Sequence, residues 1–228
     1  MDTLVPVGLL ALCVVVFVIW PLYRRREARQ ATGAWQRDAL LLGLMPHDNL
    51  ERLAEQLREF DLARVRLTGG VIGEKLGVQI QPCVFRFTKR NDRSGKDVYA
   101  TAVLIDLPSP KLRIGRIDEH VNPQSAGKDL LRQVAGAVMP QHMLPVTFSD
   151  DPGFEKKYGV SGPDHDAIRN FFSPEVRSRF ALDYDTSLLG NGKRLLWLLE
   201  HAIAQSEDFP RLLEQVEQII AAIRGPRP

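Results

Sequence analysis

One short run of ionisable residues has the types and spacing that could do chemistry, Asp164-His165-Asp166. Two carboxylates beside an imidazole can act in acid–base catalysis or bind a metal ion. The run directly follows Pro163, at the expected start of a helix, where the helix dipole alone favours acidic side chains. We therefore interpret Asp164 and Asp166 as structural residues of a helix start.

The remaining candidate groups do not form a metal or nucleophile pattern. A zinc site usually has two ligands closely spaced on one element, and the chain's five histidines lack that spacing: His47, His120, His142, His165 and His201. No serine lies in a nucleophile elbow. Cys83 follows Pro82 on an expected strand, where a thiol is more often a small core residue. The sequence predicts no catalytic residue and no metal ligand.

Two glycine-rich stretches are similar to phosphate-binding loops only in part. GGVIGEKLG at 69–77 lacks the Lys-Ser/Thr ending of that motif, and GNGKR at 190–194 is not followed by a helix N-terminus. We interpret the first as a turn between strands. The second, with Asn191 and Gly192, is typical of a tight β-hairpin turn. No cofactor-binding residue and no cofactor are predicted.

The elements that position these residues follow from the periodicity of apolar side chains. Segments 67–82, 83–90 and 97–108 alternate or run apolar, with the turn-rich NDRSGKD between the last two, which predicts an antiparallel meander. KLRIGRI at 111–117 predicts one more strand. Residues 186–199 are expected to form a hairpin around the Asn-Gly pair.

Two short helices are indicated by their N-terminal signals. In SGPD, Ser161 or Gly162 is the expected cap and Pro163 lies in the first turn. In SPEV, Ser173 is the expected cap and Pro174 takes the first helical position.

Three further segments complete the expected fold. The apolar residues Phe154, Tyr158 and Val160 predict a strand over residues 154–160. Residues 128–139 predict a short helix that ends at Pro140. The last helix, 209–223, has one apolar face that we expect to pack on the sheet. The predicted class is α+β, with a mainly antiparallel sheet packed with helices.

The N-terminal segment, residues 4–23, contains twenty residues without a charge. At about 1.5 Å per helical residue this length matches a hydrocarbon core about 30 Å thick. A secretory signal peptide would need a basic start and a small-residue cleavage site, and the chain has neither. A buried globular helix is the alternative, but the run has no polar stripe. We predict a single transmembrane anchor.

The orientation of this anchor follows from the charges that flank it. Asp2 is the only charged side chain before the segment. Four arginines follow it: Arg24, Arg25, Arg26 and Arg29. Trp20 and Tyr23 lie where aromatic rings favour the headgroup level. Because basic flanks stay inside, the sequence predicts a bacterial inner-membrane protein with its N-terminus outside and its C-terminal domain in the cytoplasm.

The predicted organisation has three parts: an anchor at 1–23, a basic juxtamembrane segment and helical stalk at 24–62, and a cytoplasmic domain at 63–228. In the stalk, Asp48 or Asn49 can cap a helix. That helix has apolar residues at spacings of three and four: Leu50, Leu53, Leu57 and Phe60.

Charge and cysteine content limit the possible partners. The chain has 30 Lys and Arg against 28 Asp and Glu, and without Asp2 and residues 24–26 it has 27 of each. A neutral body argues against nucleic acid as a partner. Cys13 in the anchor and Cys83 in the body are not expected to pair. The expected partners are the lipid bilayer, through residues 4–23, and a membrane-associated protein, with the oligomeric state left open.

The stretch FEKKYGVSGPDHDAIRNFFSPEVRSRF resembles an uncharacterised family of bacterial membrane-anchored proteins with an N-terminal transmembrane helix and a cytoplasmic α+β domain. The resemblance lies in a spaced set of residues: Phe154, Tyr158, Val160, Asp164, Arg169 and Pro174. It covers the whole architecture loosely and about seventy C-terminal residues more closely, and it implies no activity.

The sequence leaves two candidate functions open. The first is a non-catalytic protein-interaction or scaffolding module at the inner membrane, and the second is an enzyme or small-ligand sensor with a site built from dispersed residues. A cleft that gathers perturbed ionisable groups would favour the second, whereas an exposed apolar patch would favour the first.

Overall fold

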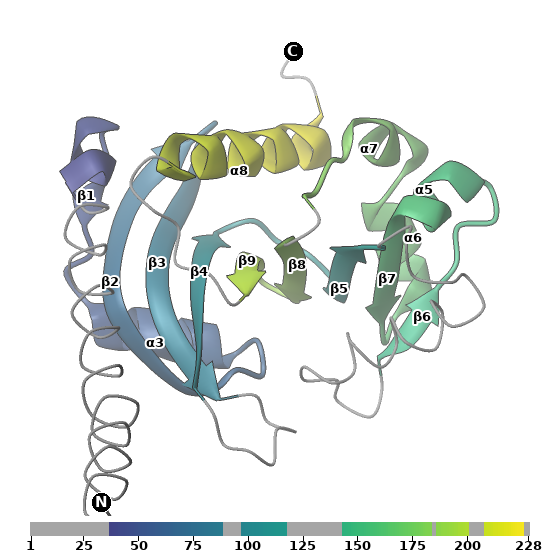
Figure 1. The fold of residues 1–228 in the computed structure, drawn as a ribbon. Helices are drawn as coiled ribbons and strands as arrows, with labels where there is room; N and C mark the ends of the chain where they lie inside the picture. The colour runs from purple at the N-terminus through teal and green to yellow at the C-terminus, as the bar shows by residue number, and fades with distance from the viewer. Residues whose placement is uncertain (1–36, 89–96, 118–142, 184–185, 201–207, 226–228) are drawn as a thin grey trace, which may run out of the picture.

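The computed structural model describes residues 37–88, 97–117, 143–183, 186–200 and 208–225, and its centre is a curved antiparallel sheet (Figure 1). The described strands lie in the order β1-β2-β3-β4-β9-β8-β5-β7-β6. Their bounds are β1 Met45–Pro46, β2 Ala63–Lys75, β3 Val78–Thr88, β4 Asp97–Ile105, β5 Lys111–Arg116, β6 Leu144–Val146, β7 Tyr158–Gly162, β8 Thr186–Asn191 and β9 Leu195–Glu200. The predicted α+β class with a large antiparallel sheet is confirmed.

The predicted antiparallel meander is confirmed, since β2, β3 and β4 pair in chain order. The predicted boundary between segments 67–82 and 83–90 is wrong, because the chain turns at Leu76 and Gly77 and residues 78–88 form one strand. The next neighbour of β4 is β9, with Val103 opposite Trp197, and β8 then separates β9 from β5. The hairpin around Asn191 and Gly192 is confirmed, because β8 and β9 pair with each other. In the sheet this hairpin lies between β4 and β5, which are consecutive strands in the sequence. Its insertion joins the two halves of the sheet.

The central strands are buried on both faces because their side chains alternate between two apolar clusters. On β4, Val103 and Ile105 belong to the cluster under helix α8, Phe209–Arg224, whereas Ala102 and Leu104 belong to the cluster under helix α3, Leu50–Arg58. Figure 1 shows α8 across one face of the sheet and α3 on the other side. The sheet is thus the middle layer of the domain.

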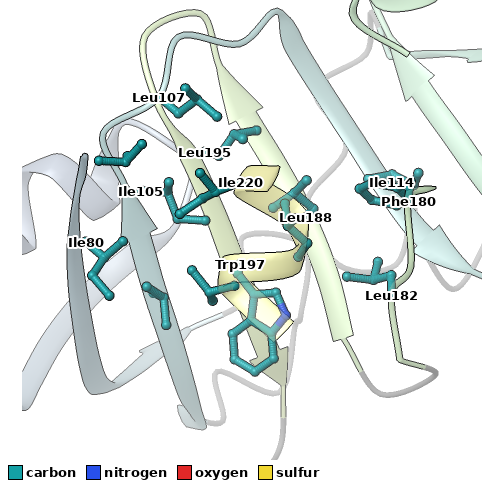
Figure 2. Packing of buried hydrophobic residues seen from close by; sticks show 14 of the residues in the cluster. Ile80, Ile105, Leu107, Ile114, Phe180, Leu182, Leu188, Leu195, Trp197 and Ile220 are labelled. Atoms are coloured by element: carbon teal, nitrogen blue, oxygen red, sulfur yellow. The ribbon is translucent and has the colours of Figure 1, made fainter. Parts of the chain in front are cut away.

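Helix α8, Phe209–Arg224, has the apolar face that its sequence predicts. The buried side chains on that face are Phe209, Leu212, Leu213, Val216, Ile219 and Ile220. Figure 2 shows Ile220 beside Ile105, Leu188 and Leu195 of the sheet. The Trp197 ring N–H donates to Gln215 of α8 at 3.1 Å, which fixes this helix against β9.

Helix α3, Leu50–Arg58, lies on the sheet, where the sequence predicted a stalk over 24–62. Leu53 and Leu57 are fully buried in the cluster formed with β3, β4 and β9. Asn49 caps the helix as predicted, since its side chain accepts the Arg52 N–H at 2.8 Å. The described residues from 37 to 62 therefore belong to the domain, because their apolar spacing is satisfied by the sheet.

Helix α5, Pro152–Lys157, replaces the first part of the strand predicted over 154–160. Asp151 caps this helix by accepting the Phe154 N–H at 2.9 Å, and Pro152 takes its first position. Phe154 and Tyr158 are four residues apart, which is a helical spacing. Only Tyr158 and Val160 lie on a strand, β7.

Helices α6, His165–Phe171, and α7, Pro174–Arg179, cover the β7 end of the sheet. The predicted cap of α6 at Ser161 or Gly162 is wrong, because both residues belong to β7 and Asp164 is the cap. The predicted cap of α7 at Ser173 is confirmed, since its hydroxyl accepts the Val176 N–H at 3.3 Å.

Two predicted elements lie outside the described residues: the membrane span at 4–23 and the helix at 128–139. Within the part of the chain that the structure describes, no helix is long and apolar enough to cross a membrane.

We expect the chain without residues 1–23 to be soluble and to unfold cooperatively. Among the described residues, both apolar clusters are built from Ala39 onward, so the described domain has an apolar core of its own. Thermal unfolding followed by circular dichroism checks this. An expressed fragment that is insoluble and shows no transition would mean that the anchor contributes to the core.

Candidate interaction surface

The structure separates the charged groups of the Asp164-His165-Asp166 run. Asp164 accepts the Ala167 N–H at 3.0 Å as the α6 cap, and Asp166 pairs with Arg169 at 3.5 Å on the exposed side of the helix. Arg169 also donates to the Thr147 carbonyl at 3.2 Å. Among the described residues no group of three His, Cys, Asp or Glu side chains is placed to hold a metal ion.

The stretch 190–194 is a turn, as predicted, whereas the stretch 69–77 is a turn only at its last two residues. Residues 69–75 belong to β2, and Leu76 and Gly77 turn the chain into β3 with φ angles of 52° and 72°. At the β8–β9 turn, the Asn191 side-chain oxygen accepts the backbone N–H groups of Lys193 and Arg194 at 2.9 and 2.8 Å. These amides hold the turn itself, and the turn leads into a strand.

Cys83 is a core residue of β3, as predicted. Its side chain is fully buried, and burial raises the pKa of the thiol far above its ordinary value. A thiol that stays protonated is a poor nucleophile. Cys83 therefore packs and does not react.

The surface feature that the fold does not explain lies at residues 40–45, just before α3. Four large apolar side chains there face solvent: Leu40, Leu41, Leu42 and Met45 are 48, 84, 41 and 65 % exposed. We call these four residues the leucine surface. They account for four of the seven large apolar side chains that are exposed among the described residues.

The leucine surface is produced by the way a helix ends. Residues 37–41 are helical, and Gly43 follows with a φ of 80°, which a glycine adopts without strain. The Leu44 N–H donates to the Ala39 carbonyl at 3.0 Å and the Gly43 N–H donates to the Leu40 carbonyl at 3.0 Å, which is the Schellman arrangement. Ala39 and Leu44 are buried by this cap, and the leucines at 40–42 are left outside.

Close packing holds this segment to the edge of the sheet. Leu44 covers Gly73 of β2 so closely that a Cβ at this position would clash with the leucine Cδ2. Met45 and Pro46 form β1 opposite Ile72 and Val71. The surface is therefore presented by a fixed backbone rather than by a loose chain end.

His47 adds a polar tie on the same edge. Its Nδ1 accepts the Asn49 N–H at 3.1 Å, so Nε2 carries the proton and donates to Gln81 at 2.9 Å. Gln81 is buried on β3, where an unpaired amide would be costly. His47 lies in the chain between the leucine surface and α3, and its hydrogen bond to the buried Gln81 holds this part of the chain to the sheet.

Sequence reasoning did not identify this surface. The run ALLLGLM contains a signal for it, because a glycine directly after three leucines can mark the end of a helix, and a cap of that kind buries the residues on either side of the three leucines. Which leucines stay outside depends on the position of β2, which the sequence alone does not give.

Comparison with known proteins adds no family. No family model matches the chain, and no curated protein matches it. Among solved structures, the chain is similar to the crystal structure of the mycobacterial trehalose monomycolate transport factor A, TtfA, with a TM-score of 0.47 and 14 % sequence identity. That match covers 89 % of this chain and 99 % of the TtfA chain.

Proposed function

We propose that this protein is a non-catalytic interaction or scaffolding module, tethered to the cytoplasmic face of the bacterial inner membrane, that docks a membrane-associated protein on its leucine surface. The tether in this proposal is the uncharged segment 4–23, and the four arginines at 24, 25, 26 and 29 keep the following domain inside the cell. The observation that carries the proposal is the leucine surface itself.

The energetic value of the leucine surface is modest. Full burial of one such side chain contributes about 1.5 to 3 kcal/mol, and these four are 41 to 84 % exposed before any partner arrives. A partner would thus gain about half of the full value for each side chain, or about 3 to 6 kcal/mol in total, before the cost of association. Such a surface binds weakly in solution and needs a tether to be occupied.

The surface lies within reach of the membrane in this proposal. Leu40 follows Tyr23 by 17 residues. That length spans about 25 Å as a helix and about 58 Å as an extended chain. A partner that is itself bound to the membrane can therefore meet the leucine surface, while both proteins are confined to a thin layer beside the bilayer.

Site-specific photo-crosslinking in cells tests this function. A benzophenone amino acid replaces Leu41 in the full chain, and the matched control places it at Leu144, which is 60 % exposed on β6 at the opposite end of the sheet (Figure 1). We expect light-dependent protein adducts in the membrane fraction from position 41 and few from position 144. Removal of residues 1–23 should abolish the adducts although the domain stays folded.

Equal adducts from positions 41 and 144 would contradict the proposal. So would the absence of any protein adduct from position 41 in a chain that is present in the membrane fraction.

A further inference from the structure

We propose that β5, β7 and β8, on the side of the sheet that carries α3, form a binding site for a small ring compound with an oxyanion, either a carboxylate or a phosphate. In this proposal Arg113 and Ser161 hold the oxyanion, and Ser187 donates to a polar group at the other end of the ring. The inference goes beyond the docking function and does not rest on it. The leucine surface lies at the β1 edge, and β2, β3, β4 and β9 separate that edge from these strands (Figure 1).

Side-chain alternation assigns the site to the α3 side of the sheet. One residue of each strand lies in the apolar cluster under α8: Ile114 of β5, Val160 of β7 and Leu188 of β8. Because side chains alternate between the two faces of a strand, the neighbours of these three point to the opposite face. Ser187 is also paired with Leu198 of β9, which belongs to the cluster under α3. The site therefore continues the face that α3 covers over β4 and β9.

Two rows of residues make up this part of the face. In one row Gly115 lies opposite Gly159 of β7 and Ser187 of β8. In the next row Arg113 lies opposite Ser161. A Cβ at Gly115 would have no heavy atom within 4 Å apart from its chain neighbours, so the face is open at this position. Glycines inside strands often mark places where a ligand approaches the backbone closely, and a flat ring fits over this row.

Two serine hydroxyls on this face are buried without a hydrogen-bond partner. Ser161 is 4 % exposed, and neither its Oγ nor the buried Oγ of Ser187 forms a hydrogen bond. They account for two of the four buried side-chain atoms that lack a partner in the described part of the chain. Because a buried hydroxyl without a partner costs free energy, two of them on one face indicate that a ligand supplies the missing acceptors.

Arg113 determines the charge of the ligand. The residue is 8 % exposed, and arginine is almost never buried unless it is paired. Arg113 already makes a contact within the protein, and a guanidinium has five N–H donors, so it can bind an oxyanion as well. Arginine binds carboxylates and phosphates with two parallel hydrogen bonds. The hydroxyl of Ser161, at the paired position on β7, provides a further donor to the same group.

The spacing of the strands sets the length of the ligand. Ser161 and Ser187 lie on the two strands that flank β5 and are one row apart, which separates their hydroxyls by about 10 to 12 Å. Free phosphate or acetate is too small to reach both hydroxyls. One six-membered ring with a polar group at each end spans this distance when both ends are hydrogen-bonded.

Equilibrium dialysis of the full chain in detergent against two nitroaromatic probes tests the site. The first probe, 4-nitrobenzoate, carries a carboxylate, and the second, 4-nitrophenyl phosphate, carries a phosphate. Both have a nitro acceptor at the other end of the ring. We expect saturable binding of at least one probe with one site per chain, and the tighter probe identifies the oxyanion. The uncharged 4-nitroanisole should bind at least about tenfold more weakly, because it cannot accept charge-assisted hydrogen bonds from Arg113.

Gly115→Val is expected to block the site and leave the fold intact. Valine favours a strand and its Cβ has open space here, so the thermal transition should be unchanged or raised. Affinity for the probe should fall at least about tenfold, because the side chain takes the place of the ring.

Ser161→Ala and Ser187→Ala distinguish a ligand role from a structural role. Each substitution removes a hydroxyl without a partner in the protein, so the thermal transition should stay the same or rise while probe affinity falls about tenfold. The matched control is Ser109→Ala. Ser109 is also buried, at 6 % exposed, but its hydroxyl donates to the Arg194 carbonyl at 2.9 Å. This control should lower the thermal transition and leave probe affinity unchanged.

The absence of saturable binding of both probes would overturn the inference, and the two serine hydroxyls would then bind water only. Equal affinities of the parent chain and Gly115→Val would place the bound probe elsewhere and would also overturn it. So would Ser161→Ala and Ser187→Ala chains that both bind the probe as tightly as the parent. Crosslinking at position 41 is measured independently, so the docking function and this site can each fail alone.

Discussion

Replacing Phe172 with alanine is expected to lower the free energy of unfolding by about 3 to 5 kcal/mol, because the ring is fully buried and its removal leaves a cavity. Phe172 lies at the centre of an aromatic cluster. Its ring centroid is 5.7 Å from that of Phe154, 6.3 Å from Phe148 and 5.2 Å from Phe180. Denaturant unfolding of the chain without residues 1–23 measures the change.

Two neighbours serve as controls for this loss. Phe171→Ala should cost less than Phe172→Ala, because Phe171 is only partly buried beside the same cluster. Asp164→Asn should cost at most about 1 kcal/mol, because asparagine also caps helices well and only the dipole contact weakens. If Asp164→Asn left stability unchanged but abolished function in the cell, the structural interpretation of this helix start would be wrong.

Arg177→Ala is expected to cost about 2 to 4 kcal/mol, because the guanidinium is buried and joins three elements. It donates to Asp150, to Asp151 at 3.2 Å and to the Phe172 carbonyl at 3.1 Å, and it lies 5.1 Å from the centre of the Phe148 ring. Without it the Phe172 carbonyl loses this donor. The carboxylates of Asp150 and Asp151 reach water, with 62 and 34 % of their side chains exposed, which limits the loss.

Arg179 on the same helix is the matched control. Its side chain is 44 % exposed, and it pairs with Glu175 at 3.1 Å on the helix surface. Exposed pairs of this kind contribute about 0.3 to 0.5 kcal/mol. Equal unfolding free energies for Arg177→Ala and Arg179→Ala would mean that the buried arginine is not a structural joint between α5 and α7.

Local patterns in the sequence predicted those parts of the fold that depend on neighbouring residues. The Asn-Gly pair at 191 and 192 predicted a hairpin because a two-residue turn favours such residues, and Ser173 with Pro174 predicted a helix start because each fits its position without strain. Both elements are confirmed. The apolar face of the last helix was likewise readable from its spacing alone.

Features that depend on distant contacts were missed. Phe154 was assigned to a strand because it precedes Tyr158 and Val160, yet the Asp-Pro cap at 151 and 152 makes it helical. The placement of β9 beside β4 joins residues about ninety positions apart, which no local pattern encodes. Arg177 gave no signal at all, since its burial results from the meeting of α5 and α7.

The leucine surface shows the same limit. Apolar residues in a sequence are first expected in the core, and at 39–45 two of them, Ala39 and Leu44, are indeed buried. The leucines at 40–42 and Met45 face solvent, while the cap at Gly43 and the pairing of β1 with β2 turn Leu44 inward. Only the structure separates the two groups, and the proposed docking function depends on that separation.

The proposed location is tested most directly by membrane topology. An export-dependent alkaline phosphatase and a fluorescent protein are each fused after Pro228 of the full chain. With residues 4–23 as the anchor and the arginines at 24–26 and 29 on its inner flank, we predict a fluorescent fusion in the membrane fraction and an inactive phosphatase. An active phosphatase at this position would place the domain outside and contradict a cytoplasmic docking module.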